Sequence, residues 1–296
     1  MEIDSENIKE KDLFKAAEEG DSSIFESLSP QSLSKSLSLT NEDARSLLHV
    51  ATSSGHSKVV KILLSCDASA EVINSADEEG WAPLHSAASI GNLEILEALL
   101  NKGLHYKKGR CGLVSESHNS CYKDSSTDRA RTNDEESLVN YNDMEPKVLK
   151  VYSRRPKAAV KRADVNIKNN GGRTALHYAA SKGRMKIAEK LISHNANINI
   201  KDKVGCTPLH RAASTGNSEL CEFFIEEGAD VDAVDRAGQT PLMNAVICYN
   251  KVVALLLIRH GADVDVEDKE GYTVLGRVTD DGFRTILIDA AKTMLE

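Results

Sequence analysis

The chain has 296 residues and a formal net charge of −8; 41% of its residues are hydrophobic and only 4% are aromatic. Its six cysteines include no CxxC pair, and no run of eighteen apolar residues occurs, which argues against a disulfide-stapled secreted domain and a transmembrane helix. We therefore expect a soluble intracellular protein with reduced thiols.

A tetrapeptide of the type Thr-Pro-Leu-His recurs along the chain. The copies lie at 46–49, 82–85, 174–177, 207–210, 240–243 and 273–276. The last four copies are evenly spaced, the first two lie slightly further apart, and the step from the second to the third is much longer. This motif at an even period of about 33 residues is typical of ankyrin repeats. The chain thus resembles an ankyrin-repeat protein, which implies an all-α solenoid with β-hairpin fingers and a role in binding.

Seven repeats are predicted in chain order. An atypical first repeat runs from about 7 to 39, five follow from near 41, 77, 171, 204 and 237, and a shortened last one spans 269–296. Within the repeat at 205–233, Thr207 is expected to cap a first helix over 209–214, with Pro208 at its first position. Apolar residues at helical spacing over 220–225 predict a second helix with one buried face.

One repeat carries an additional stretch of chain, because the step between its tetrapeptide and the next one far exceeds the period. Two later repeats contain the stretch Gly-Ala-Asp-Val-Asp, at 228–232 and 261–265. In this repeat the glycine is Gly103, and the continuation, Ala-Asp-Val-Asn, appears only at 163–166. Excising 104–162 restores the period. The sequence therefore predicts repeats over 1–103 and 163–296, separated by an insertion at 104–162. Its low content of Leu, Ile and Phe predicts that this insertion is disordered.

Charge is divided unevenly between these parts. The insertion has 13 basic and 8 acidic residues, whereas the remainder has 24 basic and 37 acidic residues. An acidic array should repel nucleic acid and favour a basic protein surface. Residues 147–162 contain seven basic residues and no acidic one, which is a nuclear-localisation or anionic-partner signal. The alternative, which we favour, is that the insertion comes from an alternative transcript and has no selected role.

No catalytic, cofactor or metal site is predicted. The tetrapeptide histidines are His49, His85, His177 and His210. Because each lies on a separate repeat, each ring is expected to hydrogen-bond nearby backbone rather than to share a metal ion. Phosphate-binding, hydrolase and kinase motifs do not occur, and the carboxylates fall mostly in the fingers, where turn formation accounts for them.

Three stretches resemble the gankyrin family, the non-ATPase regulatory subunit 10 of the 26S proteasome. They are DEEGWAPLH at 77–85, TALHYAASK at 174–182 and HRAA at 210–213. The resemblance covers nearly all of the chain outside 104–162. It implies a monomeric, cytoplasmic and nuclear chaperone for assembly of the proteasome regulatory particle. Its concave face would bind the C-terminal domain of an AAA+ ATPase subunit. One departure is LMNAV at 242–246, where the family has an LxCxE motif that links it to the retinoblastoma protein.

The same resemblance implies contact residues for a partner with basic and acidic patches. The family's basic and acidic positions match Arg45, Lys182, Asp43 and Glu78. We add Trp81, Tyr178 and Arg211 as anchors, because these residue types dominate binding hot spots. For Trp81, packing between fingers is an equal alternative. The alternative function is an ankyrin adaptor for a kinase, transcription factor or ubiquitin ligase.

Overall fold

The computed structural model describes residues 9–66, 69–101 and 162–293. The described residues all belong to one compact unit, in which the chain before the predicted insertion and the chain after it fold together. The predicted insertion at 104–162 lies outside the described residues except for Arg162, so its disorder stays a prediction.

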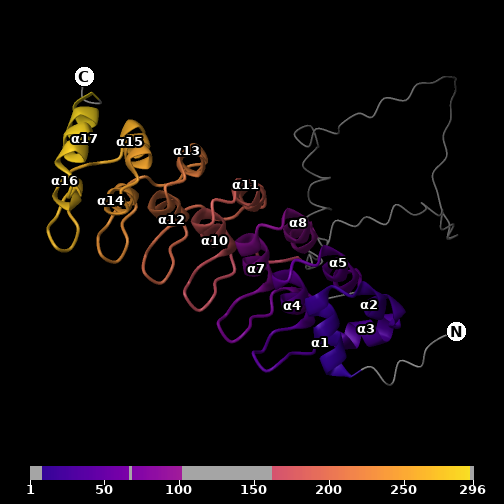
Figure 1. The fold of residues 1–296 in the computed structure, drawn as a ribbon. Coiled ribbons are helices and arrows are strands. Elements are labelled where there is room, and N and C mark those ends of the chain that lie inside the picture. Colours follow the sequence, from indigo (N-terminus) through magenta and orange to yellow (C-terminus); the bar gives the residue numbers. More distant parts are fainter. Residues whose placement is uncertain (1–8, 67–68, 102–161, 294–296) are drawn as a thin grey trace, which may run out of the picture. The chain divides into compact units, whose positions relative to one another are not determined.

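Helices in this unit follow one another in pairs (Figure 1). The first members, called the inner helices, are α1 (Glu10–Glu19), α4 (Leu47–Ser53), α7 (Pro83–Ile90), α10 (Ala175–Ser181), α12 (Pro208–Thr215), α14 (Pro241–Ile247) and α16 (Val274–Arg277). The second members, called the outer helices, are α2 (Ser22–Ser27), α5 (Ser57–Ser65), α8 (Leu93–Asn101), α11 (Met185–Ser193), α13 (Ser218–Glu226), α15 (Lys251–Arg259) and α17 (Asp281–Thr293). Two short helices, α3 (Pro30–Ser36) and α6 (Ala70–Ile73), follow α2 and α5.

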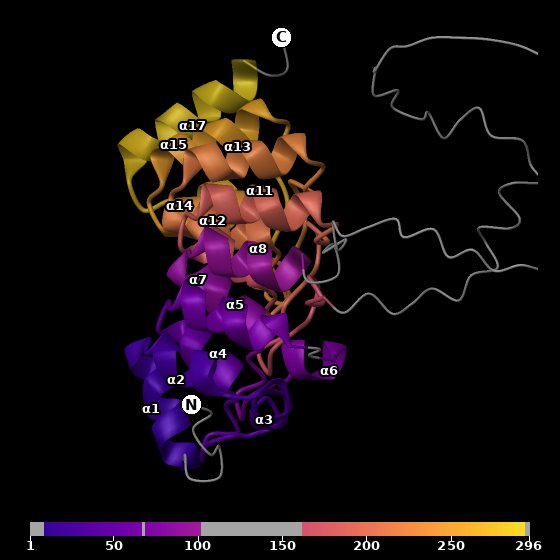
Figure 2. The same cartoon turned by 90° about the vertical axis from the view of Figure 1, so that its right-hand side faces the viewer.

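Each inner helix packs on the next one along the chain, and α7 packs on α10 across the insertion. The outer helices form a second row, visible in Figure 2 as a stack from α5 to α17. Leu209, Ala212, Leu220 and Phe224 show how one repeat contributes to the core between these rows, since all four are fully buried. The predicted all-α solenoid is therefore confirmed.

Capping explains where the inner helices begin. In α12, Pro208 occupies the first turn, and the Thr207 hydroxyl accepts a hydrogen bond from the His210 amide at 3.5 Å. The His210 ring reaches back, and its Nδ1 accepts from the Thr207 amide at 3.1 Å. Gly216 ends the helix with a φ of 75°, a left-handed conformation that suits glycine. The helix thus extends one residue beyond the predicted 209–214 at each end.

Between helix pairs, the chain forms projecting turns, called the fingers, on one side of the stack (Figure 1). Each finger begins with Asn or Asp, at 41, 77, 169, 202, 235 and 268. At Asp235, for example, Oδ1 accepts from the amides of Ala237 and Gln239 at 2.8 and 2.9 Å. The described residues contain one isolated antiparallel bridge, between Thr40 and Ser46, and no strand. The β-hairpins predicted for the fingers are therefore not confirmed as strands. Each finger is a tight turn in which the Asx side chain adds its bonds to a backbone bond, such as the one from the Asp235 amide to the Gln239 carbonyl at 3.0 Å.

The two sides of the insertion are joined by a helix-ending hydrogen bond. The amide of Ala163 donates to the carbonyl of Leu99 at 3.1 Å. In the later repeats the same bond spans five positions, from Ala229 to Phe224 and from Ala262 to Leu257. This is a common way to close a helix. Leu99 and Ala163 thus have the relation that they would have if the insertion were absent.

Candidate functional site

The fingers and the exposed sides of the inner helices form one continuous surface, which we call the inner face. It has two adjoining hollows near its N-terminal end. The first hollow, of about 630 Å³, lies between α1, the finger at 40–45 and α4. The second, of about 390 Å³, lies between that finger and the next one, at 77–81. Asp43 and Arg45 line both hollows.

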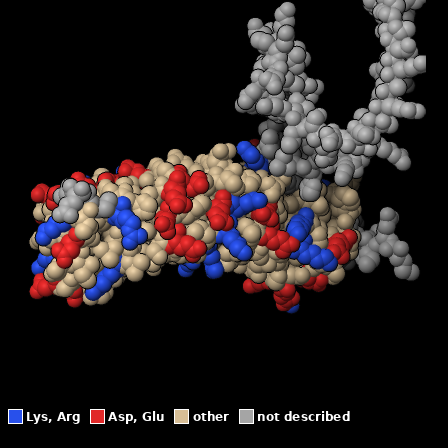
Figure 3. Space-filling model, turned by 90° about the horizontal axis from the view of Figure 1, so that it is seen from above, with Lys and Arg blue, Asp and Glu red and all other residues tan. Residues whose placement is uncertain are grey.

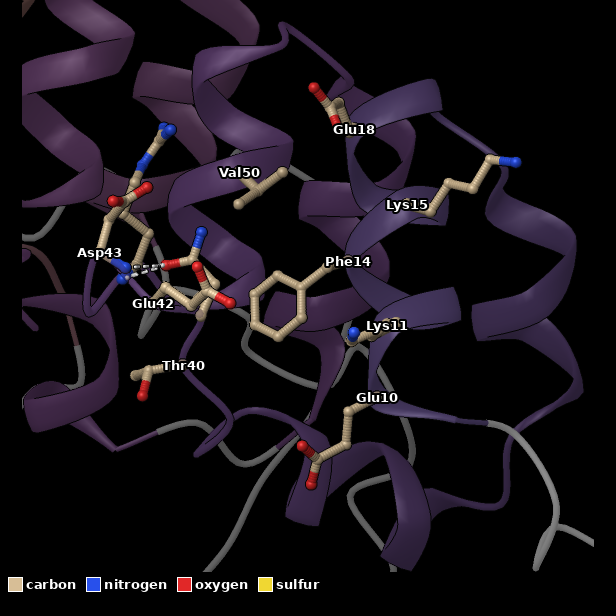
Figure 4. Close-up of a pocket in the computed structure, with 11 residues that line it drawn as sticks. Glu10, Lys11, Phe14, Lys15, Glu18, Thr40, Glu42, Asp43 and Val50 are labelled. Carbon is tan, nitrogen blue, oxygen red and sulfur yellow. Dashed lines mark hydrogen bonds between the residues drawn. The ribbon is translucent and has the colours of Figure 1, made fainter.

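The first hollow surrounds an apolar side chain with charges of both signs. Phe14 projects from α1 toward the finger, with Lys11 and Glu18 on the same helix (Figure 4). Phe14 is half-buried, so part of its ring is open to a partner. The sequence did not single out this residue, because α1 lacks the tetrapeptide. Leu13, Ala16 and Ala17 have the spacing of a buried helix face. Phe14 lies beside that face, so it could have been identified as an apolar residue at its edge.

The second hollow brings together Asp43, Arg45, Glu78 and Trp81 from the predicted site. Asp43 and Glu78 are exposed, and no ion pair joins either of them to another described residue. Arg45 is half-buried, and its Nη2 donates to the Ser53 hydroxyl at 2.5 Å. The fingers are joined directly, since the Glu78 amide donates to the Asp43 carbonyl at 3.3 Å. The hollow therefore presents acidic and basic groups on linked backbone.

Trp81 and Tyr178 form a half-buried aromatic pair with ring centroids 4.4 Å apart. The buried His85 ring lies 6.0 Å from each of them in an edge-on arrangement. The Tyr178 hydroxyl also accepts from the Asn169 side-chain amide at 2.7 Å. Trp81 thus packs against side chains of two inner helices, one of them in the next repeat, while both rings keep some exposed surface for contact.

Lys182 and Arg211 lie further along the inner face and line neither hollow. Lys182 caps the C-terminal end of α10 and is exposed. Arg211 is paired with the carboxylate of Asp202, whose side chain is only 1% exposed. Burial opposes ionisation of Asp202, but the hydrogen bond and charge of Arg211 hold the pKa of that carboxyl below its usual value. Arg211 therefore has a structural partner within the chain.

The tetrapeptide histidines belong to the scaffold. In each, Nδ1 accepts from the backbone amide that precedes the helix, and Nε2 donates to a carbonyl of the next repeat. For His177 that carbonyl belongs to Cys206, at 3.0 Å. Burial lowers the pKa of His177 to about 4, so the ring is neutral at pH 7. In the described part of the chain, no three His, Cys, Asp or Glu residues gather where they could hold a metal ion.

On the opposite side, the outer helices carry charges of both signs (Figure 3). Several pair between neighbouring helices, including Lys58 with Glu26 at 2.8 Å and Lys190 with Glu97 at 2.9 Å. Such exposed pairs contribute little to stability.

Comparisons with known proteins place the chain in a family. The family model described as ankyrin repeats matches residues 13–109, 149–235 and 216–287, which is more than half of the chain. No curated protein matches the chain. No helix among the described residues is long and apolar enough to cross a membrane. The repeat pattern, the stacked helix pairs and this match agree that the chain belongs to the ankyrin-repeat family.

Proposed function

We propose that this protein-binding scaffold is a chaperone for assembly of the 26S proteasome regulatory particle. Its inner face would bind the C-terminal domain of an AAA+ ATPase subunit of the proteasome base. The stretches at 77–85, 174–182 and 210–213 that resemble the gankyrin family are the reason for choosing this partner. We further propose that the protein acts as a monomer in the cytoplasm and nucleus.

The observation that carries the proposal is the second hollow. Asp43, Glu78, Arg45 and Trp81 line it together, although they come from two different fingers. The exposed side chains of the fingers and inner helices are not covered by the next repeat, so they are free to contact a partner. An interface with exposed charges around half-buried aromatic rings resembles a binding hot spot with a polar rim.

Charge supports a partner that carries basic and acidic patches. Outside the insertion, the chain has 24 basic and 37 acidic residues, so a basic domain would be attracted at long range. Arg45 and Lys182 would then contact acidic groups on that domain and fix its orientation. Because these groups lie at the surface, the rate of association should fall as salt is added.

The test is a calorimetric titration of the ATPase C-terminal domain into the full-length chain at low and high salt. We expect saturable binding that weakens with salt. Reversing the charges of Arg45 and Lys182 together, as Arg45→Glu and Lys182→Glu, should weaken binding at least tenfold, which corresponds to about 1.4 kcal/mol. Lys186→Glu, an exposed position on the outer helix α11, is the matched control and should change little.

Two outcomes would count against the proposal. Equal affinity for the charge-reversed chain would remove Arg45 and Lys182 from the site. No binding by the full-length chain calls for the same titration with 104–162 deleted. Recovered binding would show that the insertion obstructs the inner face, whereas continued absence would favour the adaptor function.

A further inference from the structure

The residue nine positions after the start of each finger lies on the inner helix that follows it. In two of the later repeats this residue is an arginine that pairs with the aspartate at the finger's start. Arg211 pairs with Asp202, and Arg277 Nε donates to Asp268 Oδ2 at 2.6 Å. Both carboxylates have side chains only 1% exposed, so the arginines compensate charges that water cannot reach.

The repeat between these two lacks the arginine. Its finger begins with Asp235, and the residue nine positions on is Asn244, on α14. Asn244 lies one repeat period after Arg211 and one before Arg277, so the three positions are equivalent. The side-chain nitrogen of Asn244 is buried and has no hydrogen-bond partner among the described residues. A buried donor without a partner is uncommon and costs stability.

Asp235 also lacks the second cation that Asp202 has. Arg173, in the preceding finger, lies 3.6 Å from Asp202 Oδ2. The equivalent residue beside Asp235 is Cys206, whose Sγ–H contacts Asp235 Oδ2 at 3.8 Å. Burial raises the pKa of Cys206 to about 11, so at pH 7 it is a neutral thiol and a weak donor. Among the described residues, then, no cation pairs with Asp235.

Asp235 nevertheless has the fixed geometry of its neighbours. Its Oδ1 is held by the two amide donors of the finger, which leaves Oδ2 directed away from the backbone bonds. The residue is half-buried, whereas Asp202 and Asp268 are buried. The repeat thus has an oriented, half-buried carboxylate without the guanidinium that pairs with the equivalent aspartate in both flanking repeats.

We propose that Asp235 binds an arginine side chain of the protein partner, which takes the place that Arg211 and Arg277 occupy in the flanking repeats. Arginine fits better than lysine, because its planar group can donate two parallel hydrogen bonds to a carboxylate. The residue would be a specificity determinant, since a partner without a cation there would leave Asp235 half-buried and unpaired. This inference rests on the proposed function only for the identity of the partner.

The test needs no partner protein. N-acetyl-arginine amide and its uncharged counterpart, N-acetyl-citrulline amide, are titrated into the full-length chain while backbone amides are followed by NMR. The amides of Ala237 and Gln239 report on the site, because both donate to Asp235 Oδ1. We expect shifts at these two amides with the arginine compound that are at least threefold larger than with the citrulline compound.

Two variants keep the finger intact and separate charge from fold. Asp235→Asn keeps the Oδ1 acceptor, as Asn41 and Asn169 do at the same position, and should lose the arginine-specific shift. Asn244→Arg supplies the cation within the chain, as α12 and α16 do, and should raise the melting temperature while abolishing the response. An equal response to both compounds in the unaltered chain, or a response that persists in Asp235→Asn, would overturn the inference.

The ATPase domain then distinguishes this inference from the proposed function. If the domain binds the unaltered chain, Asn244→Arg should weaken that binding at least tenfold, and equal binding would show that no arginine of this partner reaches Asp235. If the domain does not bind but the arginine compound shifts Ala237 and Gln239, the proposed partner is wrong and the arginine site stands.

Discussion

The two ends of the inner face differ in the residue nine positions after the start of each finger. Near the N-terminus, the residues nine positions after the finger starts are Val50 and Ser86, which are small and border the two hollows. Toward the C-terminus, Arg211 and Arg277 stand at this position and pair with buried aspartates. The helices and fingers are alike in both regions. The residue nine positions after the finger start therefore differs between the two regions: a small side chain borders each hollow, whereas an arginine pairs with an aspartate of its own repeat.

The histidines also divide the inner face, and they give the largest expected effect: α4, α7, α10 and α12 carry a histidine in the first turn, where α14 and α16 carry Met243 and Gly276. His177 has a pKa of about 4 in the folded chain, against an ordinary value of 6.5. Between these values the unfolded chain binds more protons, so the free energy of unfolding should fall as the pH drops from 6.5 toward 4. The loss is about 1.4 kcal/mol per pH unit, or roughly 3 kcal/mol in total.

Chemical denaturation at several pH values measures this loss. His177→Met should be less stable at pH 7, because the Thr174 amide and the Cys206 carbonyl lose their partner, yet it should lose less on acidification. His260→Met, at an exposed histidine, is the control and should keep the full dependence. An unchanged pH dependence in His177→Met would show that this ring does not titrate differently in the two states.

Removing Arg211 tests whether the arginines hold the C-terminal region together. Arg211→Ala leaves the carboxylate of Asp202 buried, with Arg173 as the remaining cation at 3.6 Å. We expect the free energy of unfolding to fall by about 2 kcal/mol, less than for a buried charge left fully unpaired. Lys58→Ala removes an exposed pair with Glu26 and should cost less than about 0.5 kcal/mol. Equal losses in the two variants would mean that the Arg211 pair is no stronger than a surface one.

A substitution in the first finger should give the smallest change in the free energy of unfolding, and it should raise this free energy rather than lower it. Ala44 has a φ of 57°, whereas the other fingers place glycine at this point of the turn. Ala44→Gly should stabilise the chain by about 1 kcal/mol, because a left-handed conformation costs alanine more than glycine. In the second finger, Gly80→Ala should destabilise it, since the new Cβ would lie 2.6 Å from the Asn170 backbone nitrogen. Thermal melts compare the two variants, and a loss of stability in Ala44→Gly would contradict the strain assigned to Ala44.

Much of the scaffold was predictable, because local chemistry repeats at a fixed period. Thr207 and Pro208 predict where α12 begins, and Gly216 predicts where it ends, since each acts on backbone within a few residues. The fingers were predicted only in part. The repeat pattern suggested hairpins between the helix pairs. In the structure each turn is closed by a backbone hydrogen bond together with bonds to Oδ1 of an Asp or Asn, and the described fingers contain no strand.

The candidate site was predictable only in part. Asp43, Arg45, Glu78 and Trp81 were chosen by resemblance and residue type, and the structure places them around one hollow. Phe14 was missed, because its neighbours across the hollow lie on a finger that follows two further helices in the chain. Arg211 was chosen by residue type alone, which does not reveal that Asp202 is its partner.

The sequence by itself determined the repeat period, the caps of the helices and the place where the repeats are interrupted. These depend on interactions between residues close together in the chain. Only the tertiary structure showed which charges are paired and which are open to a partner, because pairing depends on the distances and burial that folding gives to side chains from different elements. Asp202, Asp235 and Asp268 occupy equivalent positions in sequence. Folding brings Arg211 and Arg277 onto the first and the last, whereas no cation pairs with the second among the described residues.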